Sequence, residues 1–301
     1  MFEVSATDPE RRFRFGRYVA TNSTPRCNQL NAASIRSPSG RIAFAVGVQE
    51  SLTCRMQQIF PNPIDHVDPV VLYRSDEREP VDERPWVMCN MISSADGGIA
   101  VDGTSGGLGS DGDKSVYNAL RSIPDVVVVA SGTVIAEDYG PAQLSEELQS
   151  ERRSLGQRQL PRIAVVTGSL SIDPGHRVFA AETDPLVITT ESSDEGRRAA
   201  LGSVAELVLA GVENVDLRDA MAQLWKMGAR TVLLEGGPSL NGAFIDADLV
   251  DELCLTIAPF VLGGQSPRIV NRSVNGSLRK LELVRTLHED DYLFQRYLRR
   301  R

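Results

Sequence analysis

"TVLLEGGPSLNGAFIDADLVDEL", residues 231–253, joins a short apolar run to a charge, two glycines and a proline. The run at 232–234 has the length and continuous apolarity of a buried parallel strand. Glycine leaves backbone N–H groups uncovered, and proline fits the first turn of a helix. Gly236 and Gly237 therefore predict a strand-to-helix turn that can bind a phosphate group. Glu235 either points at another part of the ligand or forms an ion pair.

Apolar runs of similar length recur along the chain and are separated by helix-like stretches. The runs lie at 85–92, 125–131, 162–168, 185–190 and 230–237. The expected helices lie at 113–122, 142–158, 194–201 and 215–228. This alternation predicts an α/β fold, with a mixed, mostly parallel central sheet and flanking helices.

The end of the chain changes character. Three further runs have the pattern of strands, at 252–263, 277–288 and 291–300, with a turn near Asp290. We expect them to add antiparallel strands at an edge of the sheet. Because the first of them is strongly apolar, it could also pair two subunits.

The composition argues against several classes of protein. The formal net charge of −8 disfavours a nucleic-acid-binding protein, whose binding face is usually basic. The four cysteines and three histidines show no metal-ligand spacing, which predicts reduced thiols and no metal site. No apolar run reaches the ~20 residues of a membrane-spanning helix. We therefore expect a cytoplasmic protein with neither a membrane nor a nucleic-acid partner.

The first 55 residues differ from the rest, with eight arginines, no lysine and four acidic residues. Within them only 42–48, IAFAVGV, has the pattern of a strand. A disordered leader, a targeting peptide and sequence upstream of the true start all fit 1–55, although the acidic residues weaken the second. Met56 opens a more ordinary segment, which favours the third. We predict an extended lead-in at 56–83 and a single domain at 84–301.

Two glycine-containing stretches follow the run at 85–92. Asp96 precedes two glycines, and an Asp-Gly pair is typical of a turn that needs no ligand. GLGSDG at 107–112 matches the dinucleotide-binding pattern GxGxxG, but no strand directly precedes it and no acid follows at the end of the next strand. It instead predicts a loop that leads into a helix, with Ser110 or Asp111 as the N-cap.

VVVVASGTVIAEDYG, residues 126–140, has a buried strand that ends in a small, polar turn. Gly132 allows the backbone to approach a ligand closely, and Thr133 offers a hydroxyl. A helical turn that begins here could bind a phosphate, and a plain strand-to-helix turn capped by threonine fits equally well. Ligands of open α/β sheets bind beyond the carboxyl ends of the strands. Two such turns and Glu235 therefore predict a ligand site along one edge of the sheet.

These motifs together resemble the reductase domain of bacterial riboflavin biosynthesis, which has a dihydrofolate-reductase-like fold. The resemblance is carried by SADG at 94–97, ASGTVIAED at 130–138, LLEGGPSLNGAFIDADLVDEL at 233–253 and APFVLGG at 258–264. It covers residues 84–298. The zinc signature of the deaminase that often accompanies this domain is absent, so the chain resembles a stand-alone reductase.

The resemblance implies an enzyme that uses NADPH as hydride donor. The implied substrate is 5-amino-6-(5-phosphoribosylamino)uracil or its diaminopyrimidinone analogue, whose ring-opened, imine-like ribosylamine is reduced at C1′ to the ribityl form. Such chemistry depends mainly on positioning, so a strong general acid is not obviously required. The resemblance also implies a homodimer.

Site residues follow from the same resemblance. Cofactor contacts are expected at Gly132, Thr133, Val134, Gly236 and Gly237. Thr167 and Ser169 are expected at the adenosine 2′-phosphate. Catalytic residues that contact the base or sugar of the substrate are expected at Asp96, Asp138 and Glu235. Further substrate contacts are expected at Ser110 and Arg121, the latter on the ribose phosphate.

The chain departs from the family at two phosphate contacts. Asn90 stands where the family often has a lysine, and the segment after Asp138 lacks an arginine that is often found there. Because these two cations are missing, the sequence is compatible with three functions. These are a reductase of a phosphoribosylamino-pyrimidine, a reductase of a pterin such as dihydrofolate, and a non-catalytic relative that binds nucleotides.

Overall fold

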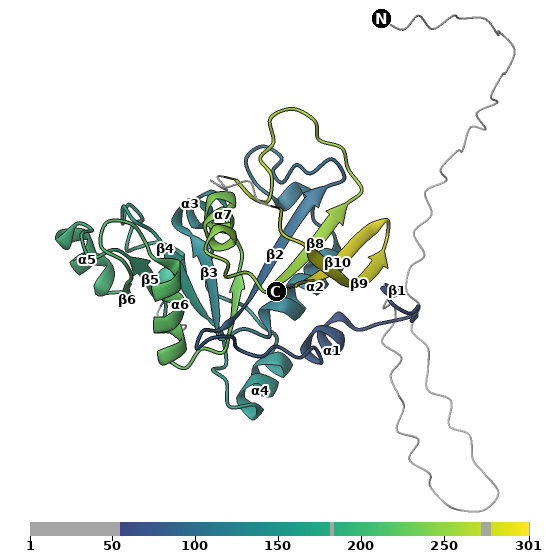
Figure 1. Cartoon of the computed structure of the whole chain (residues 1–301), viewed down its shortest axis with the longest axis horizontal. Coiled ribbons are helices and arrows are strands. Elements are labelled where there is room, and N and C mark those ends of the chain that lie inside the picture. The colour runs from purple at the N-terminus through teal and green to yellow at the C-terminus, as the bar shows by residue number, and fades with distance from the viewer. Residues whose placement is uncertain (1–54, 181–183, 272–277, 301) are drawn as a thin grey trace, which may run out of the picture. The chain divides into compact units, whose positions relative to one another are not determined.

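The structure, a computed structural model, describes residues 55–180, 184–271 and 278–300. Residues 51–301 form one compact unit, and its described part contains a single ten-stranded sheet with helices packed against it (Figure 1). The mixed, mostly parallel sheet that the sequence predicts is confirmed. The strand expected at 42–48, and the leader expected at 1–55 apart from Arg55, lie outside the described residues.

Seven neighbouring strands of the sheet run parallel, and three antiparallel strands extend it on one side. In spatial order the parallel strands are β8 (Glu252–Ala258), β2 (Trp86–Ser94), β7 (Thr231–Leu234), β3 (Val126–Ala130), β4 (Arg162–Val166), β5 (Leu186–Thr189) and β6 (Glu206–Leu209). Beyond β8 come β10 (Tyr292–Arg299), β9 (Leu281–Glu289) and β1 (Gln57–Phe60). All the strands predicted within the described residues are present, whereas the sequence did not predict the two edge strands, β1 and β6.

Seven α-helices are found in the described part of the chain. They are α1 (Pro69–Arg74), α2 (Asp111–Arg121), α3 (Ser131–Ala136), α4 (Glu146–Ser154), α5 (Glu195–Gly202), α6 (Leu217–Lys226) and α7 (Pro238–Asp246). Ser110 is the N-cap of α2, because its hydroxyl accepts a hydrogen bond from the Asp113 N–H at 3.1 Å. Gly228 follows α6 with φ of 98°, the left-handed conformation in which glycine ends helices.

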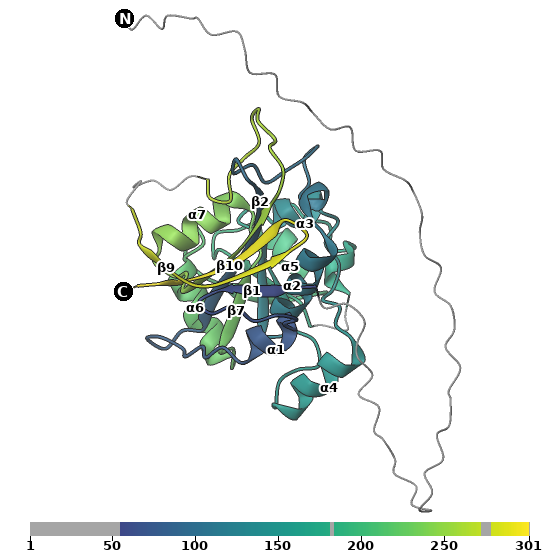
Figure 2. The same cartoon turned by 90° about the vertical axis from the view of Figure 1, so that its right-hand side faces the viewer.

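Helices cover both faces of the sheet, because successive side chains of a strand point to opposite faces. In β3, Val126 and Val128 belong to one core, and Val127 and Val129 belong to the other. Helices α6 and α7 pack on the first core, and α1, α2 and α3 pack on the second (Figure 2). Burial on both sides explains why the parallel strands have continuous apolar sequences.

The lead-in at 56–83 differs from the extended segment that we expected. It contains β1 and α1, and Met56 and Tyr73 are buried in the same core as α2. Elements of four and six residues are too short to show a readable periodicity. The lead-in therefore contributes a strand and a helix to the compact unit that holds the rest of the sheet.

The run at 252–263 contains β8, which is parallel to β2 and lies inside the sheet. The prediction of an antiparallel edge strand is therefore wrong for this run. Helix α7 joins β7 to β8, and a helical crossover returns the chain to the same end of the sheet. Strands β9 and β10 are antiparallel as predicted, and Asp290 lies in the turn between them. Because β8 pairs with β2 and β10 on its two sides, it cannot pair subunits through a free edge.

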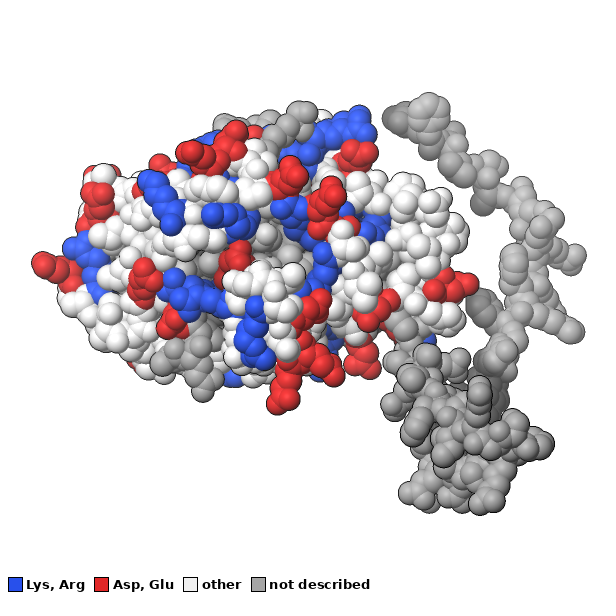
Figure 3. Space-filling model, turned by 90° about the horizontal axis from the view of Figure 1, so that it is seen from below, with Lys and Arg blue, Asp and Glu red and all other residues white. Residues whose placement is uncertain are grey.

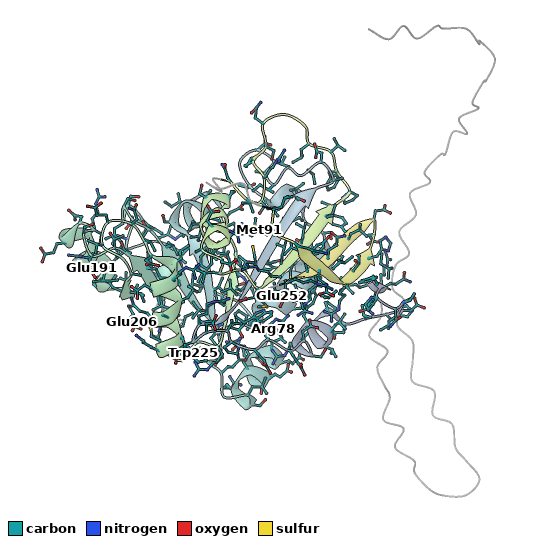
Figure 4. The ribbon with its side chains drawn as sticks, viewed as in Figure 1. Arg78, Met91, Glu191, Glu206, Trp225 and Glu252 are labelled. Atoms are coloured by element: carbon teal, nitrogen blue, oxygen red, sulfur yellow. The ribbon has the colours of Figure 1, made fainter. Side chains whose placement is uncertain are left out.

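A cluster of buried charges ties the lead-in to the sheet (Figure 4). Glu252 on β8 is fully buried and accepts two hydrogen bonds from Arg78, each of 2.9 Å. Arg296 donates to Glu252 at 2.8 Å and also pairs with Asp76 at 3.2 Å. Arg285 donates two hydrogen bonds to Asp76, at 2.6 and 2.8 Å. These five residues form the buried charge cluster, in which three cations and two anions pair away from water.

Charges of both signs are interspersed on the surface shown in Figure 3. A mixed surface of this kind lacks the continuous basic face by which proteins attract nucleic acid, at least on the side in view. Among the helices of the described residues, none has the length and apolarity that a membrane crossing requires.

Candidate active site

A cleft of about 1140 Å³ opens beside the carboxyl ends of β2, β7 and β3. Helix α2 forms one wall, and α3 with the residues that follow it forms another. Asn90 and Met91 of β2 line the cleft together with Glu235 and Gly237 after β7; Figure 4 labels Met91 at this end of its strand. This is the position at which open α/β sheets bind ligands, and the volume suits a sizeable one.

Glu235 forms an ion pair with Arg121 at the inner end of the cleft. The guanidinium donates to both carboxylate oxygens, at 2.9 and 2.8 Å, and it also donates to the Tyr139 hydroxyl. The Tyr117 ring packs against the guanidinium with its centroid 4.4 Å away. Burial by itself would lower the pKa of Arg121, but the charge and hydrogen bonds of Glu235 raise it above its usual range. Of the two sequence-based possibilities for Glu235, the structure contains the ion pair.

The two glycine turns meet across the cleft. Gly236 has φ of 90°, which only glycine adopts without strain, and its carbonyl accepts a hydrogen bond of 2.7 Å from the Ala130 N–H before α3. A Cβ atom at Gly237 would lie 2.7 Å from the Thr133 hydroxyl, whereas a Cβ at Gly132 would meet nothing within 4 Å. The turns after β7 and β3 are thus held in contact, with a bare backbone position facing open space.

Two acidic residues follow α3 and point in different directions. Asp138 accepts a hydrogen bond of 2.9 Å from Arg177, and both side chains are more than half exposed. Glu137 accepts a hydrogen bond of 2.9 Å from the Ser105 N–H, which closes the cleft on that side. The sequence predicts a role for Asp138 only; both acids and Arg177 line the cleft.

Asp96 does not line the cleft; it holds two loops together. Its carboxylate accepts hydrogen bonds from the Ser94 hydroxyl at 2.5 Å and from the N–H groups of Gly263 at 2.7 Å and Leu262 at 3.1 Å. These donors, the serine first, lower the pKa of Asp96 to about 2. In this arrangement the carboxylate orders the loop after β8, and catalysis by Asp96 remains a prediction.

Replacement of Asp96 by alanine is expected to loosen the loop after β8. We expect chymotrypsin to cut after the exposed Phe260 severalfold faster in Asp96→Ala, because the two hydrogen bonds that fix the loop are lost. Limited proteolysis followed by mass spectrometry measures the rate. Asp219→Ala, which removes an exposed aspartate of α6, should cleave like the unmodified protein. Equal rates for the two variants would contradict this role of Asp96.

Four of the expected cofactor residues do not line the cleft: Gly236, in the turn described above, and Val134, Thr167 and Ser169. The Val134 side chain is fully buried in the core. Thr167 is also buried, and its hydroxyl accepts a hydrogen bond from the Leu170 N–H at 3.0 Å. Ser169 is exposed, and its carbonyl accepts a hydrogen bond of 2.9 Å from Arg197 of α5. The structure thus brings an arginine to the predicted 2′-phosphate position, where the sequence shows none nearby.

Several residues that line the cleft were not predicted from the sequence. They are Asn90 as a site residue in its own right, Asp113, Lys114, Tyr117, Glu137 and Arg177. The three on α2 lie on the face that carries Ser110 and Arg121, since residues three or four positions apart are neighbours on a helix. Helical spacing back from Arg121 is therefore a signal that could have found them. Arg177 has no such signal, because it reaches the site from a distant part of the chain.

Comparisons with known proteins agree with this geometry. A family model described as the RibD C-terminal domain matches residues 85–291. The chain is 33% identical over 186 residues to the 2,5-diamino-6-ribosylamino-4(3H)-pyrimidinone 5′-phosphate reductase of Methanothermobacter thermautotrophicus, covering 62% of this chain and 82% of that protein. It is 30% identical to the riboflavin biosynthesis protein RibD of Escherichia coli, over 60% of this chain and 50% of RibD. A crystal structure of a pyrimidine reductase-like protein from Corynebacterium diphtheriae aligns with a TM-score of 0.67 at 28% identity, covering 72% of this chain and 92% of that one.

Proposed function

The chain belongs to the RibD C-terminal domain family, and from that premise we propose that it is an NADPH-dependent reductase of riboflavin biosynthesis. Its substrate would be 2,5-diamino-6-ribosylamino-4(3H)-pyrimidinone 5′-phosphate or 5-amino-6-(5-phosphoribosylamino)uracil, reduced at C1′ of the ribosylamine. The observation that carries the proposal is the pair of contacting glycine turns beside one cleft. Relatives with the first substrate in their names, matched over most of their length, support that choice.

The residues of the cleft fit a dinucleotide. Gly132 presents bare backbone to open space, and Gly237 lies so close to Thr133 that a side chain there would clash with its hydroxyl. Bare N–H groups at such turns are suited to the phosphates of a dinucleotide. Gly132, Thr133, Gly236 and Gly237 would hold NADPH in this proposal, and Ser169 with Arg197 would lie toward its 2′-phosphate.

The reaction needs a hydride, which NADPH supplies when bound, and a fixed orientation of the pyrimidine. The Arg121–Glu235 pair, stacked between Tyr117 and Tyr139, forms a rigid wall against which a planar base can pack. Rigid walls of this kind favour reaction by holding the reacting atoms in alignment. The ion pair also keeps a bare carboxylate away from the phosphates of the ligand.

Arg121, which the sequence predicts at the substrate phosphate, is paired with Glu235. Two other cations of the cleft are candidates for this phosphate, for which the sequence lacks two of the usual contacts. Arg177 lies beside Asp138 and Gly140, and Lys114 lies on the exposed side of α2. Lys114 makes no ion pair with any residue that the structure describes. We propose that these two side chains replace the lysine and arginine that the family often has elsewhere.

Lys114→Ala and Arg177→Ala are each expected to raise KM for the phosphorylated substrate about tenfold, because a hydrogen bond to a charged group contributes ~1.5–3 kcal/mol. Turnover of the dephosphorylated ribosylamine should change little. Steady-state kinetics with both substrates measures the ratio. Arg153→Ala, which removes an exposed arginine of α4 outside the cleft, is the matched control. The same loss with both substrates would contradict a phosphate contact.

The proposed function is tested with purified protein, NADPH and each pyrimidine, followed by the loss of reduced-nicotinamide absorbance. Turnover of either pyrimidine supports the proposal. Turnover of dihydrofolate alone would favour a pterin reductase, and cofactor binding without any turnover would favour a non-catalytic relative. The expected homodimer and cytoplasmic location remain predictions, which sedimentation velocity and cell fractionation address.

A further inference from the structure

Asp113 is a carboxyl group in the cleft that the proposed function leaves unused. It lies in the first turn of α2, and its carboxylate reaches the edge of the cleft next to Gly109. The buried Thr256 of β8 hydrogen-bonds to it. Asp113 forms no ion pair within the part of the chain that the structure describes. A partly buried carboxyl without a cation is unusual, since burial of a charge needs a partner.

The surroundings of Asp113 favour its protonated form. Burial raises the pKa of Asp113, and the hydrogen bond from Thr256 offsets only part of that rise. Tyr292 of β10 faces Asp113, and Glu289 of β9 lies against the neighbouring Gly112. The charge of Asp111 acts on Glu289. Lys114 on the adjacent position is the nearest cation in sequence, but its side chain is exposed.

Four of the other acids near the cleft are engaged as acceptors. Glu235 accepts both donors of Arg121, Asp138 accepts from Arg177, and Asp96 accepts from the loop after β8. Glu137 accepts from a backbone N–H. Asp111 also lines the cleft, but it is exposed, whereas Asp113 is partly buried. Asp113 is therefore the cleft carboxyl best placed to act as a donor.

We infer that Asp113 is the general acid of the reduction, an inference that rests on the proposed function. Its proton goes to O4′ as the C1′–O4′ bond breaks, and the electron pair of that bond remains on the oxygen. The nitrogen lone pair forms a C1′=N bond, and the hydride supplied by the cofactor then adds to C1′ and returns that pair to nitrogen. The substrate is reduced by two electrons, and the carboxylate of Asp113 regains a proton from water. One hydride and one proton are consumed.

The inference is tested with Asp113→Asn, which keeps the shape and removes the acid. We expect kcat to fall about 100-fold, in line with the usual contribution of a general acid. In the unmodified protein kcat/KM should fall as pH rises through the pKa of Asp113, and this alkaline limb should disappear in the variant. Asp113→Glu should restore part of the rate. Calorimetry should find NADPH affinity unchanged within about twofold.

Two controls separate catalysis from structure. Asp219→Asn removes an aspartate from the first turn of α6, outside the cleft, and should leave both rate and pH profile unchanged. Thermal unfolding supplies a readout without substrate. Because folding raises the pKa of Asp113, its ionisation costs stability as pH rises from the unfolded to the folded value. Asp113→Asn should therefore melt a few degrees higher than the unmodified protein at neutral pH.

The outcomes distinguish the inference from the function beneath it. If the unmodified protein reduces neither pyrimidine, the proposed function is overturned and the inference with it. If it does reduce one, and Asp113→Asn retains the alkaline limb, only the inference is overturned. A variant that merely shifts preference between the diaminopyrimidinone and the uracil substrate would also overturn it, because Asp113 would then recognise the base.

Discussion

Glu252→Ala is expected to lower the free energy of unfolding by about 3–5 kcal/mol, the usual cost of removing one partner from a buried ion pair. Glu252 is fully buried, and Arg78, Arg296 and the Trp86 ring N–H all donate to it. Without the carboxylate, the buried charge cluster would contain three cations and one anion. Urea denaturation measures the change, and the thermal midpoint should fall by roughly 10 °C.

The same carboxylate should make stability depend on pH. Burial by itself would raise the pKa of Glu252, but the charges and hydrogen bonds of Arg78 and Arg296 lower it to about 2. The unfolded chain therefore binds a proton at higher pH than the folded chain does. The contribution of Glu252 is fully present above the unfolded value near 4.5 and is lost as pH falls toward 2. In Glu252→Ala this part of the acid sensitivity should be absent.

Glu282→Ala is the matched control for Glu252→Ala. Glu282 is a strand carboxylate that pairs with Arg300 at 2.8 Å, but the pair lies on the surface. Exposed pairs contribute little, so this variant should unfold at nearly the same urea concentration as the unmodified protein. If the two variants lost the same small amount of stability, the buried charge cluster would not be what anchors the lead-in.

The parallel strands could be predicted from the sequence because a strand that is buried on both faces has a continuous apolar sequence. Runs such as VVVVA at 126–130 are apolar at every position, and this one forms β3. The edge strands β1 and β6 were not predicted from the sequence because they are short and partly exposed. The direction of β8 was predicted wrongly because the apolar pattern of one segment does not determine which strands are its neighbours in the sheet. It depends on α7, whose crossover lets β2 lie between β7 and β8.

The site could be predicted where it depends on backbone geometry, and less where it depends on long-range contacts. The turns at Gly132 and Gly237 were visible as glycines at strand ends, and both lie at the cleft. The sequence offered an ion pair only as one of two possibilities for Glu235, and it did not identify Arg121, 114 positions away, as the partner. Arg177 could not be found at all, because its place beside Asp138 arises from the packing of separate segments.

Gly237→Val is expected to weaken NADPH binding by at least about 100-fold, equal to ~2.7 kcal/mol. Gly237 is the N-cap of α7 and has φ of −77°, outside the left-handed region that favours glycine. The new side chain would project toward the Thr133 hydroxyl, which lies 2.7 Å from the Cβ position. It would thus clash with Thr133 and change the surface that the two glycine turns present to the cleft. Isothermal titration calorimetry with NADPH measures the loss.

The choice of Gly237 separates loss of the site from loss of the fold. Gly236 would be a poorer target, because its φ of 90° makes any side chain a source of strain. Gly202→Val is the control, since this glycine lies at the end of α5 away from the cleft and its Cβ would come no closer than 3.4 Å to Leu207. Both variants should keep the circular dichroism of the unmodified protein. If Gly237→Val stays folded and binds NADPH normally, the dinucleotide does not bind against these turns. The cleft would then serve a different ligand.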